Sequence, residues 1–227
     1  MIMEDISVII PVYNEETTIG QLLRSLRYFK DLDIVIVDGG STDKTASIAK
    51  DAGVRFIKAE KGRASQMNKG AKYAERPILM FLHADTWPGA GSLRSIKEYI
   101  DKGFIGGCLT QEIDSTGFIY KIIQASGNIR ARFFKIFYGD QAIFVKKDIF
   151  LKIGCFDEVE FFEDILLSRK LKRVGKTCVL SEKIYTSKRR WEKQGIVKTT
   201  LINWLMRCGF LLQIPAAGLK KIYKDIR

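Results

Sequence analysis

The sequence of 227 residues has only one histidine, His83, and four cysteines, none of which belongs to a Cys-x-x-Cys pair. Zinc knuckles and disulfide frameworks both require closely spaced ligands or cysteines, so the sequence predicts neither of them. Scattered free cysteines fit a reducing compartment. We therefore expect a cytoplasmic protein.

Signals for secretion are also missing. The N-terminus, Met1-Ile2-Met3-Glu4-Asp5, is acidic and leads directly into an apolar segment. A signal peptide begins instead with basic residues and ends at a cleavage site of small residues. We expect a protein that is not secreted.

Acidic residues are the minority charge, because 26 Asp and Glu against 38 Lys and Arg leave a net charge of +12. Such a balance favours nucleic acid, anionic lipid or phosphorylated substrates as partners. No zinc finger or RNA-recognition strand accompanies the charge, so we expect no nucleic-acid partner. Most of the excess is interpreted as solvated helix surface, and the rest would meet phosphates if the substrate were a nucleotide.

Short apolar runs followed by polar residues make up the first half of the sequence. Strands alternate there with helices, which is typical of βαβ units and a mainly parallel, Rossmann-like sheet. The predicted strands are 6–12, 34–37, 55–57 and 78–82, and the predicted helices are 17–29, 41–52, 64–74 and 92–102.

The second half is more mixed. We expect strands near residue 109 and at 141–145, 177–180 and 184–187, a basic amphipathic stretch over 118–137, and helices at 163–174 and 196–212. The order predicts an α/β fold with a catalytic domain over 1–194 and a helical C-terminal segment over 195–227. Within the domain we expect a nucleotide-binding half, 1–105, and an acceptor half, 106–194.

Two acidic motifs follow predicted strands that are buried on both faces. Asp38-Gly39-Gly40-Ser41-Thr42-Asp43 follows the strand at 34–37, and His83-Ala84-Asp85 follows the strand at 78–82. The carboxyl ends of parallel strands form the ligand-binding edge of an open α/β sheet. The two motifs therefore predict a site for a nucleotide and a metal ion.

Four motifs resemble, in order and spacing, the glycosyltransferases of family 2, which have the GT-A fold. They are Ile10-Pro11-Val12-Tyr13-Asn14-Glu15, the Asp38 motif, the His83 motif and Glu163-Asp164. Residues 61–68, 81–86 and 139–141 look like a bacterial subgroup of that family, in which His-Ala-Asp replaces Asp-x-Asp. The resemblance covers nearly the whole chain.

The resemblance implies that Pro11, Tyr13 and Glu15 shape a pocket for base and ribose, and that Asp38 hydrogen-bonds the nucleobase. A carboxylate at a strand end can accept such an N–H, although a turn that caps the next helix is the structural alternative. Gly39 stands where the family commonly has a second Asp, so the nucleobase stays open.

Arg63 is the predicted phosphate ligand, because a guanidinium matches phosphate oxygens and Gly62 lets the backbone come close. Gln66 and Asn68 would hold either the sugar or their own loop, and the resemblance adds Gln141 to the donor site.

The His83 motif is expected to bind Mn²⁺ or Mg²⁺. Asp85 matches the last carboxylate of Asp-x-Asp, which in relatives holds a cation that bridges the diphosphate, while Ala84 lines the donor site. A contact with the sugar or a supporting role is favoured for His83 over direct coordination of the metal.

Glu163-Asp164 opens a predicted helix, where carboxylates are favoured by the helix dipole. The resemblance implies that Asp164 is the general base and that Glu163 supports it. Arg189-Arg190-Trp191 looks like the Arg-Trp of a Gln-x-x-Arg-Trp motif without its Gln, which implies that Arg190 reaches the diphosphate and Trp191 stacks on an acceptor. Capping of the last strand is the structural alternative.

These residues together predict an inverting glycosyltransferase with a nucleotide-sugar donor, most readily of UDP or GDP type, and an unidentified hydroxyl acceptor. One alternative is a nucleotidyltransferase of similar fold, although the Gly-rich phosphate loop that it would need after the first strand is missing. The other is a basic, non-catalytic protein that binds nucleotides or nucleic acid.

Residues 201–219 are apolar enough to approach spanning length but are interrupted by Asn203, Arg207, Gln213 and Pro215. We expect this segment not to cross a bilayer. Together with Lys220, Lys221, Lys224 and the basic stretch around Arg130, Arg132 and Lys135, it would suit an anionic membrane surface. Packing against the catalytic domain or a second copy of the chain is the alternative, and is favoured.

Overall fold

The computed structural model describes residues 5–212, and the predicted continuation at 213–227, with Pro215 and the lysines that follow it, lies outside the described residues. The described residues form one mixed sheet in the order β3-β2-β1-β4-β7-β6-β8-β5. Its strands are β1 (Ile6–Val12), β2 (Asp33–Asp38), β3 (Arg55–Lys58), β4 (Ile78–Phe81), β5 (Thr86–Pro88), β6 (Gly106–Ile113), β7 (Phe144–Lys146) and β8 (Thr177–Thr186).

The strands β3, β2, β1 and β4 are parallel, as the alternation in the sequence predicts. The strand β7 is antiparallel to both β4 and β6, and β6 pairs with β8 in parallel. The helices are α1 (Ile19–Leu26), α2 (Thr45–Asp51), α3 (Arg63–Tyr73), α4 (Ser92–Asp101), α5 (Phe118–Phe134), α6 (Lys147–Lys152), α7 (Glu163–Val174), α8 (Arg189–Gln194) and α9 (Ile196–Leu211), with a 3₁₀ turn, η1 (Gly139–Gln141).

Apolar residues cover both faces of the sheet. In β1, Ile10 and its alternate neighbours lie in a core with α1 and α4, whereas Ile9 lies in a second core with α3, α6 and α7. Every residue of β1 is buried. This two-sided burial explains why the first strand is a continuous apolar run rather than an alternating one.

Local sequence explains where the best-predicted helices form. In α1 the buried residues Ile19, Leu22, Leu23 and Leu26 recur at helical spacing. The helix α7 has acidic residues in its first turn and basic residues in its last turn, which complements the helix dipole. Its observed bounds are those that the sequence predicts.

Some elements differ from the prediction. The strand expected at 141–145 begins only at Phe144, because residues 139–141 form η1. The strands expected at 177–180 and 184–187 are one strand, β8, whose pairing with β6 shifts register between Cys108 and Thr110. The elements β5, α6 and α8 were not predicted, because three to six residues are too few to show a hydrophobic period.

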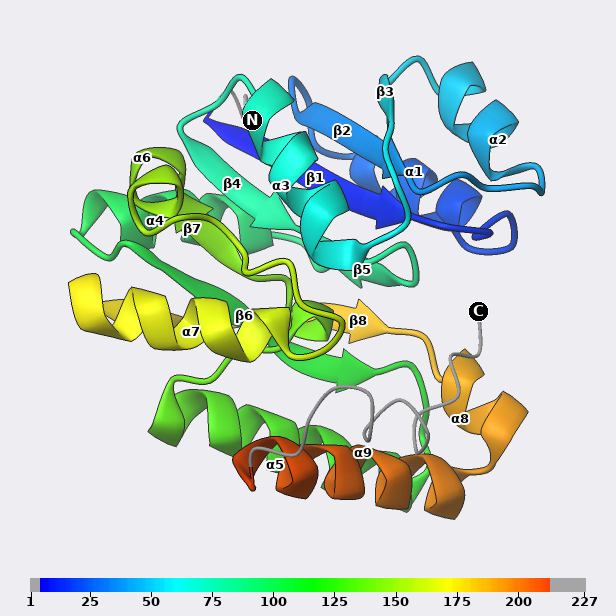
Figure 1. The fold of residues 1–227 in the computed structure, drawn as a ribbon, viewed down its shortest axis with the longest axis vertical. Coiled ribbons are helices and arrows are strands. Elements are labelled where there is room, and N and C mark those ends of the chain that lie inside the picture. Colours follow the sequence, from blue (N-terminus) through cyan, green and yellow to red (C-terminus); the bar gives the residue numbers. More distant parts are fainter. Residues whose placement is uncertain (1–4, 213–227) are drawn as a thin grey trace.

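Figure 1 shows β1, β2 and β4 pointing in one direction, so that their carboxyl ends lie at one edge of the sheet. The helix α5 contacts β6, and α9 follows α8 and lies in front of α5 in the same view. Among residues 5–212, no helix combines the length and the apolar character that crossing a bilayer requires.

Candidate active site

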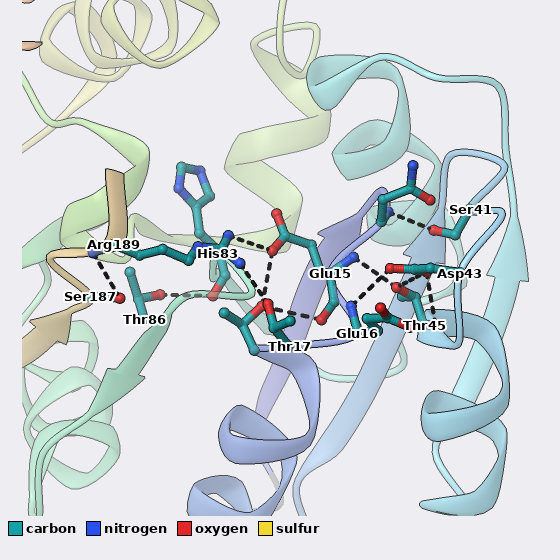
Figure 2. Close-up of polar contacts among 12 residues, drawn as sticks. Glu15, Glu16, Thr17, Ser41, Asp43, Thr45, His83, Thr86, Ser187 and Arg189 are labelled. Atoms are coloured by element: carbon teal, nitrogen blue, oxygen red, sulfur yellow. Dashed lines mark hydrogen bonds and ion pairs between the residues drawn. The ribbon is translucent and has the colours of Figure 1, made fainter. Parts of the chain in front are cut away.

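The loops that follow β1 and β2 are joined by hydrogen bonds (Figure 2). The backbone N–H of Asn14 donates to Ser41 Oγ at 2.9 Å, and that of Glu15 donates to Thr45 Oγ1 at 2.7 Å. The predicted pocket residues Pro11, Tyr13 and Glu15 therefore lie beside the Asp38 motif. One wall of the site is built from both strand ends.

Asp38 anchors the turn after β2. It is 2% exposed, and its carboxylate accepts the backbone N–H of Ser41 at 3.1 and 3.2 Å as well as the Ser41 hydroxyl. This carboxylate therefore stabilises the turn after β2, whereas Asp43, which accepts the N–H of Thr45 at 2.9 Å, is the acid at the start of α2. The predicted contact of Asp38 with a nucleobase stays a prediction, since a carboxylate has further lone pairs to offer.

Arg189 closes the site on the side of β8, and the sequence analysis did not predict this role. Its guanidinium donates from Nη2 to Glu15 Oε2 at 2.8 Å and from Nη1 to Thr17 Oγ1 at 2.8 Å, as Figure 2 shows. The run Arg189-Arg190-Trp191 was a usable signal. Because the Gln of the motif is missing, however, the sequence did not reveal which of the two arginines contacts the loop after β1.

The structure gives Arg190 and Trp191 contacts within the protein, and their predicted roles at the diphosphate and the acceptor stay predictions. Arg190 Nη2 donates to Asn203 Oδ1 of α9 at 3.4 Å. Trp191 is 8% exposed and meets Tyr120 edge to face, with ring centroids 6.0 Å apart. Because α8 starts at Arg189, its next two residues turn toward α9 and α5.

Two basic residues, one in the loop before α3 and one at the start of α3, contact other elements of the site. Lys61 Nζ lies 3.9 Å from the centroid of the Tyr13 ring, which joins this loop to the β1 loop. Arg63 Nη1 lies 3.2 Å from Glu163 Oε1, so the first residues of α3 and α7 form an ion pair. The predicted phosphate ligand is therefore beside the predicted base.

Gln66 holds the protein rather than a sugar. Its Nε2 donates to the backbone oxygens of Val12 at 2.9 Å and Val37 at 2.8 Å, which fastens α3 to the ends of β1 and β2. A Cβ on Gly39 would lie 3.1 Å from Gln66 Oε1. The side chain of Gln66 thus takes the space that a second Asp at position 39 would need.

Asn68 and Gln141 also bond within the protein, and their predicted contacts with the donor stay predictions. Asn68 is buried and exchanges hydrogen bonds of 3.0 Å with the backbone N–H and C=O of Phe156. Gln141 is fully buried, and its Oε1 accepts from Arg130 Nη2 at 3.0 Å and from the N–H of Tyr138 at 3.2 Å. Buried amides of this kind fix loops because their hydrogen bonds cannot be replaced by water.

Gly139 is where the His83 motif, η1 and α7 meet. Its N–H donates to Asp164 Oδ2 at 3.0 Å, and a Cβ on it would lie only 2.4 Å from His83 Nε2. Only glycine allows the imidazole to approach this backbone so closely. Gly139 therefore lies between His83 and the predicted base, Asp164.

Asp164 has the environment of a poised base. Its Oδ1 accepts the N–H of Ile165 at 2.7 Å, which opens α7. Burial, together with the like charge of Glu163, raises the pKa of Asp164 to about 7, against the opposing effect of its hydrogen bonds and of Arg63. A carboxylate that titrates near neutral pH can both take up and release a proton under physiological conditions.

Comparison with known families identifies this arrangement. A family model described as Glycosyl transferase family 2 matches residues 7–157, more than half of the chain. The chain belongs to glycosyltransferase family 2. The match includes the β1 loop, the Asp38 and His83 motifs and η1, but ends before Asp164.

Relatives within the family share segments rather than the whole chain. A poly-beta-1,6-N-acetyl-D-glucosamine synthase of Staphylococcus epidermidis is 34% identical over 92 residues, which are 37% of this chain and 22% of that protein. Across the curated relatives compared, the matched part spans 12% to 40% of their length.

Solved structures confirm the predicted GT-A fold. TarS of S. aureus is similar with a TM-score of 0.65 and 20% identity, over 88% of this chain and 40% of that one. The mannosyltransferase PcManGT of Pyrobaculum calidifontis, in complex with GDP-Man and Mn²⁺, is similar with a TM-score of 0.61 and 21% identity, over 79% of this chain and 56% of that one.

The residues present fit a cation that is shared with a substrate. Among residues 5–212, no group of three or more His, Cys, Asp or Glu side chains could hold a metal by itself. Mg²⁺ is commonly held by one or two carboxylates together with substrate phosphates. Asp85, in the turn that the Thr86 N–H closes onto the His83 carbonyl at 3.2 Å, is the carboxylate that the sequence analysis predicts for such a site.

Proposed function

We propose that this family 2 protein transfers a sugar from a nucleoside diphosphate donor to a hydroxyl acceptor with inversion at the anomeric carbon. The observation that carries the proposal is the junction at Gly139, where the His83 motif at the end of β4 meets Asp164 at the start of α7. His83, from the motif proposed for the donor, and Asp164, the proposed base, both adjoin this one residue.

Asp164 would accept the proton of the acceptor hydroxyl while that oxygen bonds to the anomeric carbon. The bond between this carbon and the diphosphate oxygen breaks in the same step, and the nucleoside diphosphate leaves with the electron pair. One displacement from the opposite face inverts the configuration. Glu163 would keep the proton affinity of Asp164 high, and Arg63 would hold Glu163 or a phosphate.

On the donor side, the β1 loop with Tyr13 and Glu15 would enclose the base and ribose, and Arg189 would hold that loop closed through Glu15. Asp85 would hold Mn²⁺ or Mg²⁺, which supplies charge stabilisation to the departing diphosphate when it is bound. His83, packed on Gly139, would contact the sugar. The His-Ala-Asp sequence supports membership of a subgroup with this variant of Asp-x-Asp.

The donor is proposed to be of UDP or GDP type. Support comes from relatives: TarS has been solved with UDP-GlcNAc and PcManGT with GDP-Man and Mn²⁺. A thermal-shift panel of UDP, GDP, CDP and dTDP sugars with Mn²⁺ tests the proposal, because a ligand at a hundred times its dissociation constant adds about 2.7 kcal/mol of stability. Stabilisation by none of these donors would contradict it.

The rate of donor consumption should depend on pH through Asp164. The ionised carboxylate is the active base, so kcat/KM is expected to rise about tenfold per pH unit below pH 7 and to level off above it. Glu163→Gln removes the neighbouring charge that raises the pKa, so its inflection should move to lower pH. A profile that is flat between about pH 5.5 and 8.5 would contradict the assignment.

Gly139→Ala is expected to lower turnover by about tenfold or more without unfolding the protein, because the added methyl group must displace His83 or the N–H that Asp164 accepts. Gly127→Ala is the matched control, since a Cβ on this buried glycine meets its nearest atom, Gln111 Oε1, at 3.4 Å. Equal turnover in the two variants, measured as nucleoside diphosphate released, would show that the junction is not needed.

A further inference from the structure

We infer that the outer faces of α5 and α9 form one docking surface for an anionic membrane. This goes beyond the proposed transfer reaction. The surface is defined by two apolar stripes, named here the α5 stripe (Phe118, Ile122, Ile129 and Phe133) and the α9 stripe (Val197, Leu201 and Trp204).

The α5 stripe lies on the side of the helix that faces solvent. Its four residues recur at intervals of four, seven and four positions, so they share one face, and they are 54% to 78% exposed. The opposite face of α5 carries Tyr120, Gly127 and Ala131, which are buried against the catalytic domain. The helix is therefore apolar toward both the protein and the solvent.

The α9 stripe extends the same surface. Its three residues are 57% to 75% exposed, and they recur at intervals of four and three positions along one face. A shallow hollow of about 310 Å³ joins the two helices, and Ile119 of α5 lines it together with all three α9 residues. The two stripes are thus neighbours.

Charge on the two helices has one sign. Neither 118–134 nor 196–211 contains an acidic residue, and Lys121, Arg132 and Lys198 are exposed beside the stripes. An exposed apolar face with Trp and Phe, flanked by lysine and arginine, is the pattern of helices that lie in the headgroup region of anionic bilayers.

A second copy of the chain fits this surface less well. In a symmetric dimer each patch meets the same patch, so lysines and arginines would face one another without an acid on either helix to pair with them. Anionic headgroups supply the missing charge and the acyl chains accept the apolar stripes. We therefore commit to a lipid surface as the occupant.

The helix α9, which carries one of the stripes, also reaches the residue that precedes Glu163 and the candidate base. Phe210 near the end of α9 contacts the ring of Phe162, with centroids 4.7 Å apart, and Phe162 directly precedes Glu163 and Asp164. The beginning of α9 adjoins α8, which carries Arg189. A bilayer bound here would border the acceptor half, and resting on the proposed function, this suits an acceptor hydroxyl attached to a lipid.

Vesicle flotation with the full chain tests the inference. We expect binding to vesicles of phosphatidylcholine with about 30 mol% phosphatidylglycerol, no binding to phosphatidylcholine alone, and weaker binding as salt rises from roughly 50 to 200 mM. Binding that is absent, or indifferent to lipid charge and to salt, would overturn the inference.

Paired variants locate the surface. Ile122→Ser with Phe133→Ser should weaken vesicle binding by about tenfold or more, and Lys121→Glu with Lys198→Glu should do the same. Tyr28→Ser and Lys30→Glu are the controls, because both residues are exposed and belong to neither α5 nor α9. Both variants should bind vesicles like the native protein. Circular dichroism confirms that each variant is folded, and donor-induced thermal shifts should be unchanged in all of them.

Light scattering measures the mass of the protein in solution and so tests the alternative that the stripes mediate self-association. The inference predicts that the stripe variants and the native chain have the same mass in solution. A native dimer that becomes monomeric in Ile122→Ser with Phe133→Ser, without vesicle binding in either, would assign the stripes to self-association and overturn the membrane proposal.

Discussion

Replacing Asp164 with asparagine is expected to reduce turnover by about 10² to 10⁴, the usual effect of removing a general base. Asparagine keeps the shape and can still accept the Gly139 N–H, but it cannot take a proton at neutral pH. Donor affinity should stay nearly unchanged, because the carboxylate is proposed to act on the acceptor. Nucleoside diphosphate release in the presence of the best donor measures the first effect, and calorimetry measures the second.

Asp157→Asn is the matched control for this variant. Asp157 lies in the loop before α7 and forms a 2.7 Å ion pair with Lys170, so its loss alters charge nearby without touching the Gly139 junction. Turnover in Asp157→Asn should stay close to that of the native chain. Native turnover in Asp164→Asn would instead move the base elsewhere, with Glu163 as the first candidate.

The second large effect is expected for Asp85→Asn, which should abolish Mn²⁺-dependent donor binding. The amide preserves shape but lacks the negative charge that a hard divalent cation requires. Because the proposed cation is shared between Asp85 and the donor phosphates, we also expect Mn²⁺ alone to leave the melting temperature of the native chain unchanged and Mn²⁺ with donor to raise it.

Asp51→Asn, an exposed aspartate at the end of α2, is the control and should bind donor and Mn²⁺ like the native chain. Calorimetric titration of donor in the presence and absence of Mn²⁺ measures metal-dependent donor binding in the native chain and in both variants. If Asp85→Asn bound donor plus metal unchanged, the assignment of the cation to the His83 motif would be rejected.

The parallel half of the fold was predictable because its signals are local. Continuous apolar strands such as β1 and the helical spacing in α1 record burial directly in the sequence. Short elements such as β5 and α8 exist because β8, α9 and the core hold them. Whether such short segments form a strand or a helix depends on contacts with residues elsewhere in the chain. The hydrophobic periodicity of the segment itself carries no information about those contacts.

The site shows the same division. The motif resemblance assigned His83 and Asp164 to one predicted active site. The structure adds that both residues adjoin Gly139. The resemblance could not distinguish polar residues that would face a ligand from those that bond within the protein. Hydrogen bonds to the backbone or to other side chains are made by Gln66, Asn68 and Gln141. Arg189 and Arg190 differ only in which side of a six-residue helix they occupy.

The measurement that tests the central claim most directly is nuclear magnetic resonance of donor turnover. With the donor chosen by the thermal-shift panel, and with water taking the place of the unidentified acceptor, ³¹P spectra should show the nucleoside diphosphate as one product. Early ¹H spectra should show the sugar that is bonded to the water oxygen in the configuration opposite to that of the donor. Formation of a nucleoside monophosphate with a sugar 1-phosphate, or a sugar of retained configuration, would contradict an inverting glycosyltransferase.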